Sequence, residues 1–182
     1  MRMSVLLKQL LATAVLAAPF VSPAVHAQEI KRTGVPGSTF PISLTVAVPS
    51  NARLVFVSGT LADVANPDAP KGSIEAYGDT QTQTTSILKK IDKLLAAEGL
   101  SLADVVKVNV FMVGDPKLDG KMDFNGLNAA YSQFFGSSAQ PNKAVRTALQ
   151  VAALPMPGGL IEIEATAAQV MPPPPAPPPR KK

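Results

Sequence analysis

The chain has 182 residues, with 17 lysines and arginines, 13 acidic residues and no cysteine. A chain without cysteine can form no disulfide, carry out no thiolate chemistry and carry no acylated lipoprotein cysteine. Two basic residues precede Gln28 and three follow Pro179, so the span between them carries 12 basic and 13 acidic residues. The net positive charge therefore belongs to the two ends of the chain, and no basic stripe supports nucleic-acid binding.

The first 27 residues have the pattern of a secretory signal peptide. Arg2 and Lys8 precede an apolar stretch at 10–21, and residues 25–27 form a small-residue cleavage site. The apolar stretch is shorter than the roughly 20 residues that span a bilayer, so we expect no stable membrane insertion after cleavage. We predict that residues 1–27 are removed and that the protein is periplasmic or secreted.

Residues 171–182 form a proline-rich segment that ends in three basic residues. Proline lacks the amide donor and has a fixed φ, so this segment is predicted to be an exposed polyproline II tail. Such a tail could be a ligand for a partner, an electrostatic tether to an anionic surface, or a solvated end with no specific role. The sequence leaves these three interpretations open.

A single domain is predicted at 38–170, because no composition break divides it. Residues 28–37 are predicted to form a flexible N-terminal segment. Alternating apolar residues at 42–48 and an apolar run at 54–58 flank a Pro-Ser-Asn turn, and we expect them to pair as a hairpin. A loop rich in Gly, Pro, Asp and Asn follows at 59–78.

Helical spacing of apolar residues predicts a helix at 80–98, with Asp79 as its cap and Gly99 at its end. A strand is expected at 105–113, a second helix from Asp123 to a stop at Gly136, and two final strands at 144–153 and 160–170. This order of elements predicts an α+β fold in which a mixed sheet carries two helices on one face.

Arg146 is a permanently charged residue in the otherwise apolar strand at 144–153. Its strand face reads Ala, Arg, Ala, Gln, Ala, and we predict that the opposite face, with Val145, Thr147 and Leu149, packs under the helices. If the last two strands pair as a hairpin, Arg146 shares a surface with Glu162 or Glu164. A cross-strand ion pair would contribute roughly 0.2 to 1 kcal/mol. The alternative is a site in which arginine holds a substrate carboxylate and a glutamate positions or deprotonates water.

Several other chemistries have no support in the sequence. His26 is the only histidine and is predicted to leave with the signal peptide, so a His-based triad and a conventional zinc site are not expected. The glycines at 59 and 158–159 match neither the G-x-G-x-x-G nor the P-loop pattern. We therefore expect no metal and no organic cofactor.

Several sequence blocks, in this order along the chain, resemble the RidA (YjgF) family of enamine/imine deaminases. The blocks are Leu54-Val55-Phe56-Val57-Ser58-Gly59, Gln83-Thr84, the run from Gly99 to Met112, Asp123-Phe124, Leu127 to Tyr131, Phe134-Phe135, Pro141 to Arg146, Val151 to Pro155 and Ile161 to Ala165. The resemblance covers nearly the whole domain. It implies a chorismate-mutase-like fold assembled as a homotrimer, with clefts at the subunit interfaces.

The resemblance also implies residue roles. Arg146 matches the carboxylate-binding arginine of the family, and Glu162 matches the glutamate that assists the attacking water. The implied substrate-binding positions are Ser58, Gly59, Asn128, Ala148 and Arg146. Ala148 stands where a cysteine is frequent, and Phe40 is the nearest aromatic residue to the position where many active members carry tyrosine.

These observations lead to one main hypothesis, the cofactor-independent hydrolysis of small 2-imino or enamine carboxylic acids to 2-keto acids and ammonia. This is the chemistry of a 2-iminobutanoate/2-iminopropanoate deaminase, here in an exported homotrimer. The first alternative is a non-catalytic protein that binds small keto acids or related carboxylates. The second is a structural or holdase-like protein that acts through its surface or its proline-rich tail.

Overall fold

The computed structural model describes residues 29–173. The predictions for the signal peptide at 1–27 and for most of the tail at 171–182 therefore lie outside the described residues. The strands are β1 (Lys31–Thr33), β2 (Thr45–Ala47), β3 (Ala52–Thr60), β4 (Val105–Met112), β5 (Val145–Gln150) and β6 (Ile161–Val170). The helices are α1 (Ile74–Tyr77), α2 (Thr80–Ala97) and α3 (Phe124–Phe134), and 3₁₀ turns lie at Leu102–Asp104 and Pro116–Leu118.

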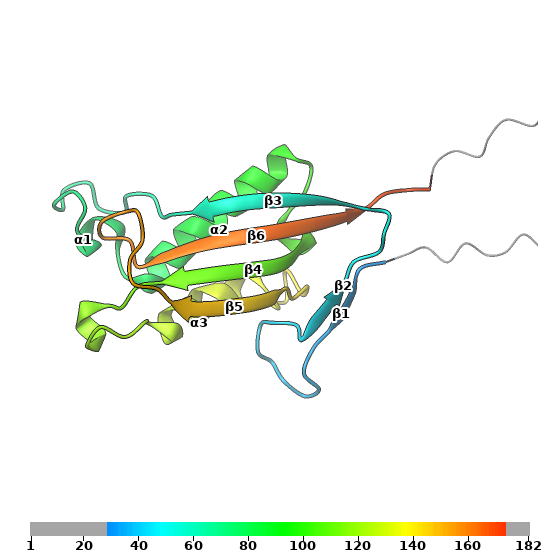
Figure 1. Cartoon of the computed structure of the whole chain (residues 1–182), viewed down its shortest axis with the longest axis horizontal. Coiled ribbons are helices and arrows are strands. Elements are labelled where there is room, and N and C mark those ends of the chain that lie inside the picture. Colours follow the sequence, from blue (N-terminus) through cyan, green and yellow to red (C-terminus); the bar gives the residue numbers. More distant parts are fainter. Residues whose placement is uncertain (1–28, 174–182) are drawn as a thin grey trace, which may run out of the picture.

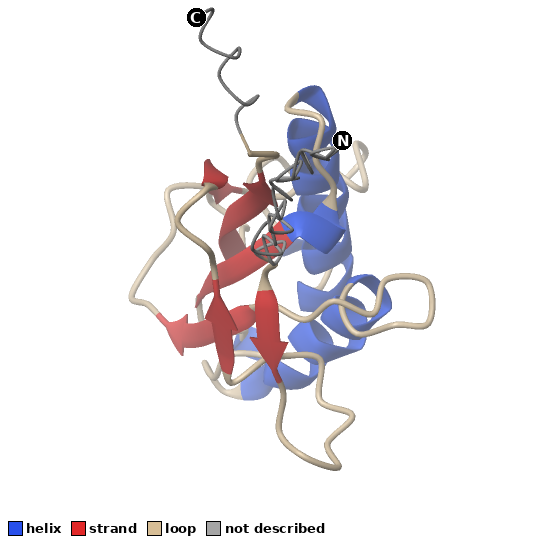
Figure 2. Cartoon of the chain, turned by 90° about the vertical axis from the view of Figure 1, so that its right-hand side faces the viewer, coloured by secondary structure: helices blue, strands red, loops and turns tan. Residues whose placement is uncertain are grey.

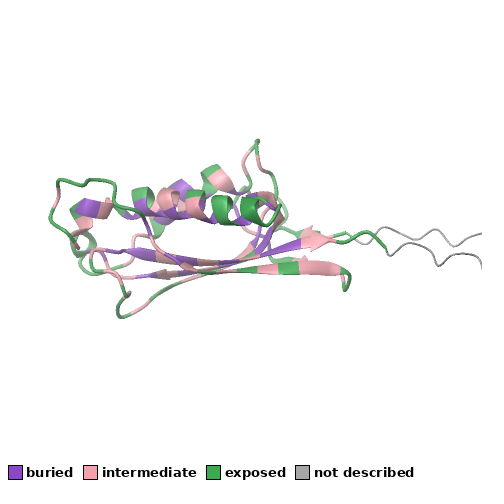
Figure 3. Ribbon diagram, turned by 90° about the horizontal axis from the view of Figure 1, so that it is seen from above, coloured by how far each residue is buried: buried purple, intermediate pink, exposed green. Residues whose placement is uncertain are grey.

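The main sheet has four strands in the order β3-β6-β4-β5 (Figure 1). β6 is antiparallel to both β3 and β4, whereas β4 and β5 are parallel. A parallel pair needs a crossover connection, and α3 supplies it between β4 and β5. Helices α2 and α3 cover one face of the sheet and leave the other open (Figure 3). The predicted α+β fold with a mixed sheet and helices on one face is confirmed.

The first predicted hairpin is wrong. β2 pairs with β1, whereas β3 pairs with β6 from the other end of the chain. β1 lies in the N-terminal segment at 28–37, which was expected to be flexible. The pairing with β6 joins seven residue pairs and that of β2 with β1 only three, so the long strand β3 finds more hydrogen-bonding partners in β6 than the short β2 could offer.

The second predicted hairpin is also wrong, because β4 lies between β5 and β6. β3 and β4 both run antiparallel to β6, so they are parallel to each other and leave room for one strand between them. β6 fills this position, while β5 adds to the outer side of β4. The last two strands therefore do not pair with each other across the turn at Pro155, as the sequence had suggested, but each pairs with β4.

The faces of the central strands follow the predicted alternation. Val108, Val110 and Met112 of β4 are buried, as are Ile161 and Ile163 of β6. They pack against the apolar side of α2, where Ile87, Ile91 and Leu95 are also fully buried. The core therefore lies between α2, α3 and the sheet (Figure 2).

The predicted helix boundaries are confirmed within a residue or two. The Asp79 side chain accepts a hydrogen bond from the Thr82 amide at 2.8 Å and caps α2, and Gly99 adopts a φ of 72° just beyond its end. Asp123 caps α3 through the Gly126 amide. No helix among residues 29–173 is both long and apolar enough to cross a membrane.

Candidate functional site

Arg146 lies on the helix side of edge strand β5, not on the open face. It is in register with buried Val108 of β4, so the two side chains point to the same side of the sheet. Arg146 Nη2 donates to Asn128 Oδ1 of α3 at 2.7 Å. The prediction that Val145, Thr147 and Leu149 pack under the helices is therefore wrong, because these residues face the open side.

Aromatic rings surround the Arg146 guanidinium. Its Cζ lies 4.4 Å from the ring centre of Tyr131 and 5.6 Å from those of Phe40 and Phe124. Tyr131 is fully buried, whereas the two phenyl rings are partly exposed. Cation–π attraction stabilises the charge at these distances, although it gives the N–H groups no strong acceptor.

The guanidinium retains an unfilled hydrogen-bonding position. Burial lowers the pKa of Arg146, an effect partly opposed by Tyr131, but an arginine stays charged at neutral pH. Its Nη1 is buried, and no group among residues 29–173 accepts a hydrogen bond from it. The Tyr131 hydroxyl is likewise buried and unpaired within this range, and burial raises its pKa. Such orphaned groups are rare in folded proteins and mark this region as a candidate anion site.

Ala148 follows Arg146 by two residues and so lies on the same side of β5, in register with Val110. Its partly buried methyl group packs against the core. A hollow of about 330 Å³ next to β5 is lined by Lys107, Val145 and Thr147, by Ile42 and Leu44, and by Arg146. Val145 and Thr147 face the open side, so this hollow lies on the side of β5 opposite the Arg146 guanidinium.

Glu162 lies on the open face of the sheet. It is in register with Phe111 of β4, and its carboxylate lies against Gly59 near the end of β3. A methyl group on Gly59 would come within 2.9 Å of the Glu162 Cδ, so only glycine leaves room for the carboxylate in this position. Gly59 and Glu162 therefore lie close together on the open face.

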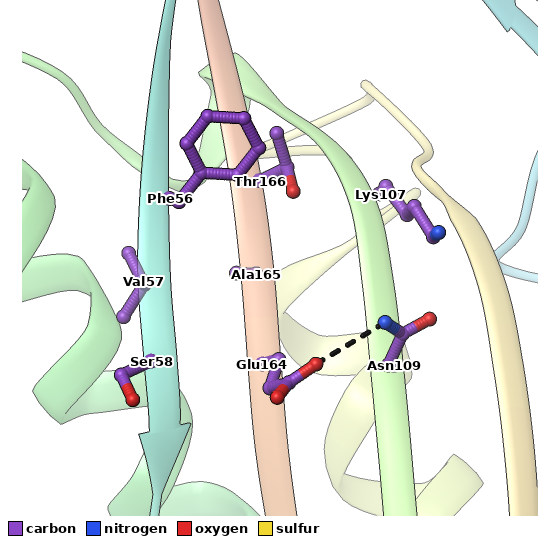
Figure 4. A pocket seen from close by; sticks show the side chains of 8 residues that line it. All are labelled: Phe56, Val57, Ser58, Lys107, Asn109, Glu164, Ala165 and Thr166. Atoms are coloured by element: carbon purple, nitrogen blue, oxygen red, sulfur yellow. Dashed lines mark hydrogen bonds between the residues drawn. The ribbon is translucent and has the colours of Figure 1, made fainter.

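Ser58 lines a neighbouring hollow of about 440 Å³ on the same open face (Figure 4). Lys107 and Asn109 of β4 line this hollow together with Glu164, whose carboxylate accepts a hydrogen bond from the Asn109 amide at 3.3 Å. The sequence prediction did not select Lys107 or Asn109. Their alternation with buried valines in β4 is the signal that could have placed them beside Glu164.

The predicted pairing of Arg146 with Glu162 or Glu164 does not occur within one chain. β4 separates β5 from β6, and the arginine side chain lies on the opposite face of the sheet from both carboxylates. The ion pairs found among residues 29–173 are Arg53–Glu98 and Lys90–Asp63, both on the surface. A single chain thus presents two separate groups of predicted site residues, Arg146 with Asn128 and Ala148, and Glu162 with Ser58 and Gly59.

Phe124 and Tyr131 were predicted only as core residues. Phe124, Asn128 and Tyr131 occur at i, i+4 and i+7, so they share the face of α3 that meets Arg146. This spacing could have linked Asn128 to the aromatic rings. Among residues 29–173, no three histidine, aspartate or glutamate side chains are grouped so that they could hold a metal ion.

Comparison with known proteins identifies the family. The Endoribonuclease L-PSP family matches residues 40–169. The chain belongs to this family, which is also called RidA or YjgF. The 2-iminobutanoate/2-iminopropanoate deaminase of Capra hircus is 33% identical over 140 residues, which cover 77% of this chain and 88% of the relative.

Two further comparisons support the assignment. A RutC family protein of Pyrococcus horikoshii is 37% identical over 115 residues, or 63% of this chain and 79% of the relative. The crystal structure of the Rid family protein YyfB from Yersinia pestis superposes with a TM-score of 0.58 at 25% identity. The match covers 78% of this chain and all of the other. The RidA-type fold expected from the sequence is therefore confirmed.

Proposed function

We propose that this RidA family member hydrolyses small 2-imino or enamine carboxylic acids to 2-keto acids and ammonia without a cofactor. The observation that carries the proposal is the Arg146 guanidinium, whose buried Nη1 finds no acceptor among residues 29–173. A substrate carboxylate matches the planar donor fork of an arginine. The relatives named 2-iminobutanoate/2-iminopropanoate deaminase support the same chemistry.

In the proposed reaction, Arg146 holds the carboxylate and Glu162 accepts a proton from water. The water oxygen forms a bond to the imine carbon while the imine nitrogen gains a proton from solvent. Glu162 then returns its proton to the amine nitrogen of the resulting carbinolamine, the hydroxyl group releases its proton to solvent as the carbonyl forms, and the C–N bond breaks to release ammonia. An enamine first takes a proton on carbon to become the imine. Because a conjugated imine is already electrophilic, orientation and one proton-transfer group are the main requirements.

We propose that two copies of the chain complete each site, in a homotrimer of the kind that the family resemblance implies. Arg146 and Glu162 lie on opposite faces of one sheet, so a cleft between subunits can combine the arginine of one copy with the glutamate of its neighbour. The open face also exposes apolar side chains, including Phe56, which is 74% exposed. Exposed apolar area of this kind favours association.

We also propose that the protein is exported, on the basis of the signal-peptide pattern at 1–27. Its substrates would then be imino acids released by exported enzymes that oxidise amino acids. Mass spectrometry of the protein recovered outside the cytoplasm tests this location. A mature chain that begins at Gln28 is expected, and an uncleaved chain retained in the cytoplasm would contradict export.

The decisive experiment generates imino acids in situ with an amino-acid oxidase and adds purified protein spanning 28–182. We expect imines derived from small, aliphatic or aromatic amino acids to disappear faster, and Arg146→Ala to abolish the acceleration. No acceleration with any imine, or full activity in Arg146→Ala, would overturn the proposal. Calorimetric binding of 2-ketobutyrate that depends on Arg146 but occurs without turnover would instead favour a non-catalytic binding protein.

A further inference from the structure

Gln83 is a fully buried polar side chain in the first turns of α2, far in sequence from every proposed site residue. Its amide makes three hydrogen bonds. Nε2 donates to the carbonyl oxygens of Gly78 at 2.8 Å and Gly158 at 3.1 Å, and Oε1 accepts from the Leu160 amide at 2.8 Å. Both amide hydrogens are therefore used, and the oxygen holds a backbone group in place.

These hydrogen bonds join two loops at one end of the sheet. Gly78 ends the loop that follows β3, whereas Gly158 and Leu160 belong to the segment that leads into β6. The two loops are in close contact, because a methyl group on Gly158 would collide with the backbone at Ser73. Gln83 thus links both loops to the start of α2.

The backbone of Leu160 is held on both sides. Its amide donates to Gln83, and its carbonyl accepts from the Val113 amide at 3.0 Å. Glu162 comes two residues later, and its carboxylate lies against Gly59, where β3 passes into the first of the two loops. The position of Glu162 relative to Gly59 therefore depends on the segment that Gln83 fixes.

We propose that Gln83 is a positioning residue that sets the entry of β6 and thereby holds Glu162 in place for the water step. The inference rests on the proposed deaminase function, although Gln83 itself does not touch substrate. Its hydrogen bonds lie at the end of β4 near Val113, whereas Arg146 is in register with Val108 and packs on α3. Gln83 should therefore affect turnover and leave the binding of a carboxylate unchanged.

The test compares Gln83→Met with Gln81→Met in the protein spanning 28–182. Methionine is similar in length but forms none of the three hydrogen bonds, and Gln81 is exposed on the same turn of α2. We expect Gln83→Met to lower kcat by about 10-fold with KM changed less than about 2-fold, because a misplacement near 1 Å can cost up to about 100-fold in rate. Gln81→Met should have the same kcat and KM as the wild type.

Two further measurements separate positioning from a loss of folding and from failure of the proposed activity. A purely structural role would lower the melting temperature and the active fraction but leave kcat per folded subunit unchanged, which would overturn the inference. The chemical shift of the Glu162 carboxyl carbon at pH 7, measured by NMR, gives a readout that needs no turnover. It should change in Gln83→Met and not in Gln81→Met, and identical spectra would overturn the inference even if the wild type hydrolyses no imine.

Discussion

Arg146 and Glu162 are held in place by different kinds of contact. Side chains surround Arg146, which has an amide partner in Asn128 and aromatic rings on α3. Backbone groups and loop ends position Glu162, through the close approach of Gly59 and the Gln83 hydrogen bonds before β6. Arg146 is thus held by side chains on a helix-covered strand, whereas Glu162 is positioned by backbone groups at a loop-rich end of the sheet.

This difference suggests that the Arg146 region serves ligand binding and the Glu162 region serves proton transfer. A guanidinium that is partly buried loses hydration and keeps a fixed direction, which suits it to hold a carboxylate. A carboxylate on an open sheet face keeps access to water, which suits it to transfer protons. Changes in the Arg146 region should therefore affect ligand affinity, and changes in the Glu162 region should affect turnover.

The largest effect is expected for Glu162→Gln. This substitution keeps the shape of the side chain and removes its basicity, so kcat should fall about 100- to 1000-fold, within the usual range for loss of a general base. KM and the calorimetric affinity for 2-ketobutyrate should stay close to wild type. A comparable loss of ligand affinity would contradict the proposed separation of roles.

Arg146→Lys should give the opposite pattern. Lysine retains the charge but not the donor fork, and it cannot keep the same geometry toward Asn128. We expect the Kd for 2-ketobutyrate to rise about 10- to 100-fold, which corresponds to the roughly 1.5–3 kcal/mol of a charge-assisted hydrogen bond. Calorimetry measures this change, and wild-type affinity in the variant would show that the guanidinium is not the carboxylate-binding group.

Gly59→Ala tests whether the position of the Glu162 carboxylate affects turnover when the carboxylate itself is kept. The new methyl group would displace the end of a flexible side chain rather than backbone, so the free energy of unfolding should change little. The displaced carboxylate should lower kcat about 30-fold, because catalysis is sensitive to small misplacements. Chemical denaturation and steady-state kinetics on the same sample give both values, and unchanged kcat would show that the contact with Gly59 is not needed.

Asn128→Ala is expected to have a smaller effect on binding. It removes the acceptor of Arg146 Nη2 and leaves a second donor of the guanidinium unpaired. Loss of orientation should raise the Kd for 2-ketobutyrate about 5- to 10-fold, in line with roughly 1 kcal/mol for one hydrogen bond. Asn128→Asp is the matched comparison, because it restores an acceptor but neutralises the positive charge, so it should weaken binding further. Stronger binding in Asn128→Asp would argue against an anionic ligand.

The smallest effect is expected on stability, from the loss of the side-chain cap of α2. The hydrogen bond from the Thr82 backbone lowers the pKa of Asp79, so the charged cap stabilises the fold at pH values above the unfolded pKa and loses this contribution as pH falls through the folded pKa. Asp79→Ala should lower the free energy of unfolding by about 1 kcal/mol at pH 7, and the difference should shrink as the pH falls below the unfolded pKa of aspartate, about 3.9. Urea denaturation at several pH values measures it, and a difference independent of pH would contradict the assignment.

Much of the fold could be predicted from local patterns. The cap at Asp79, the alternation in β4 and the glycine beyond α2 each depend on residues close in sequence. The pairing of strands could not be predicted in this way, because β3 finds its partner about a hundred residues later in β6. The contact of Glu162 with Gly59 is part of the same long-range arrangement, although the family resemblance did select both residues.

The sequence by itself determined which residues could do chemistry and which class of fold could carry them. Strand and helix periodicity, the single charged residue in an apolar strand and the family blocks are all properties of neighbouring residues. Only the tertiary structure decided that Arg146 faces α3 while Glu162 faces the open side. The reason is physical, since β4 pairs with β5 on one side and with β6 on the other, and the register of these two pairings sets the side of the sheet on which each charge lies.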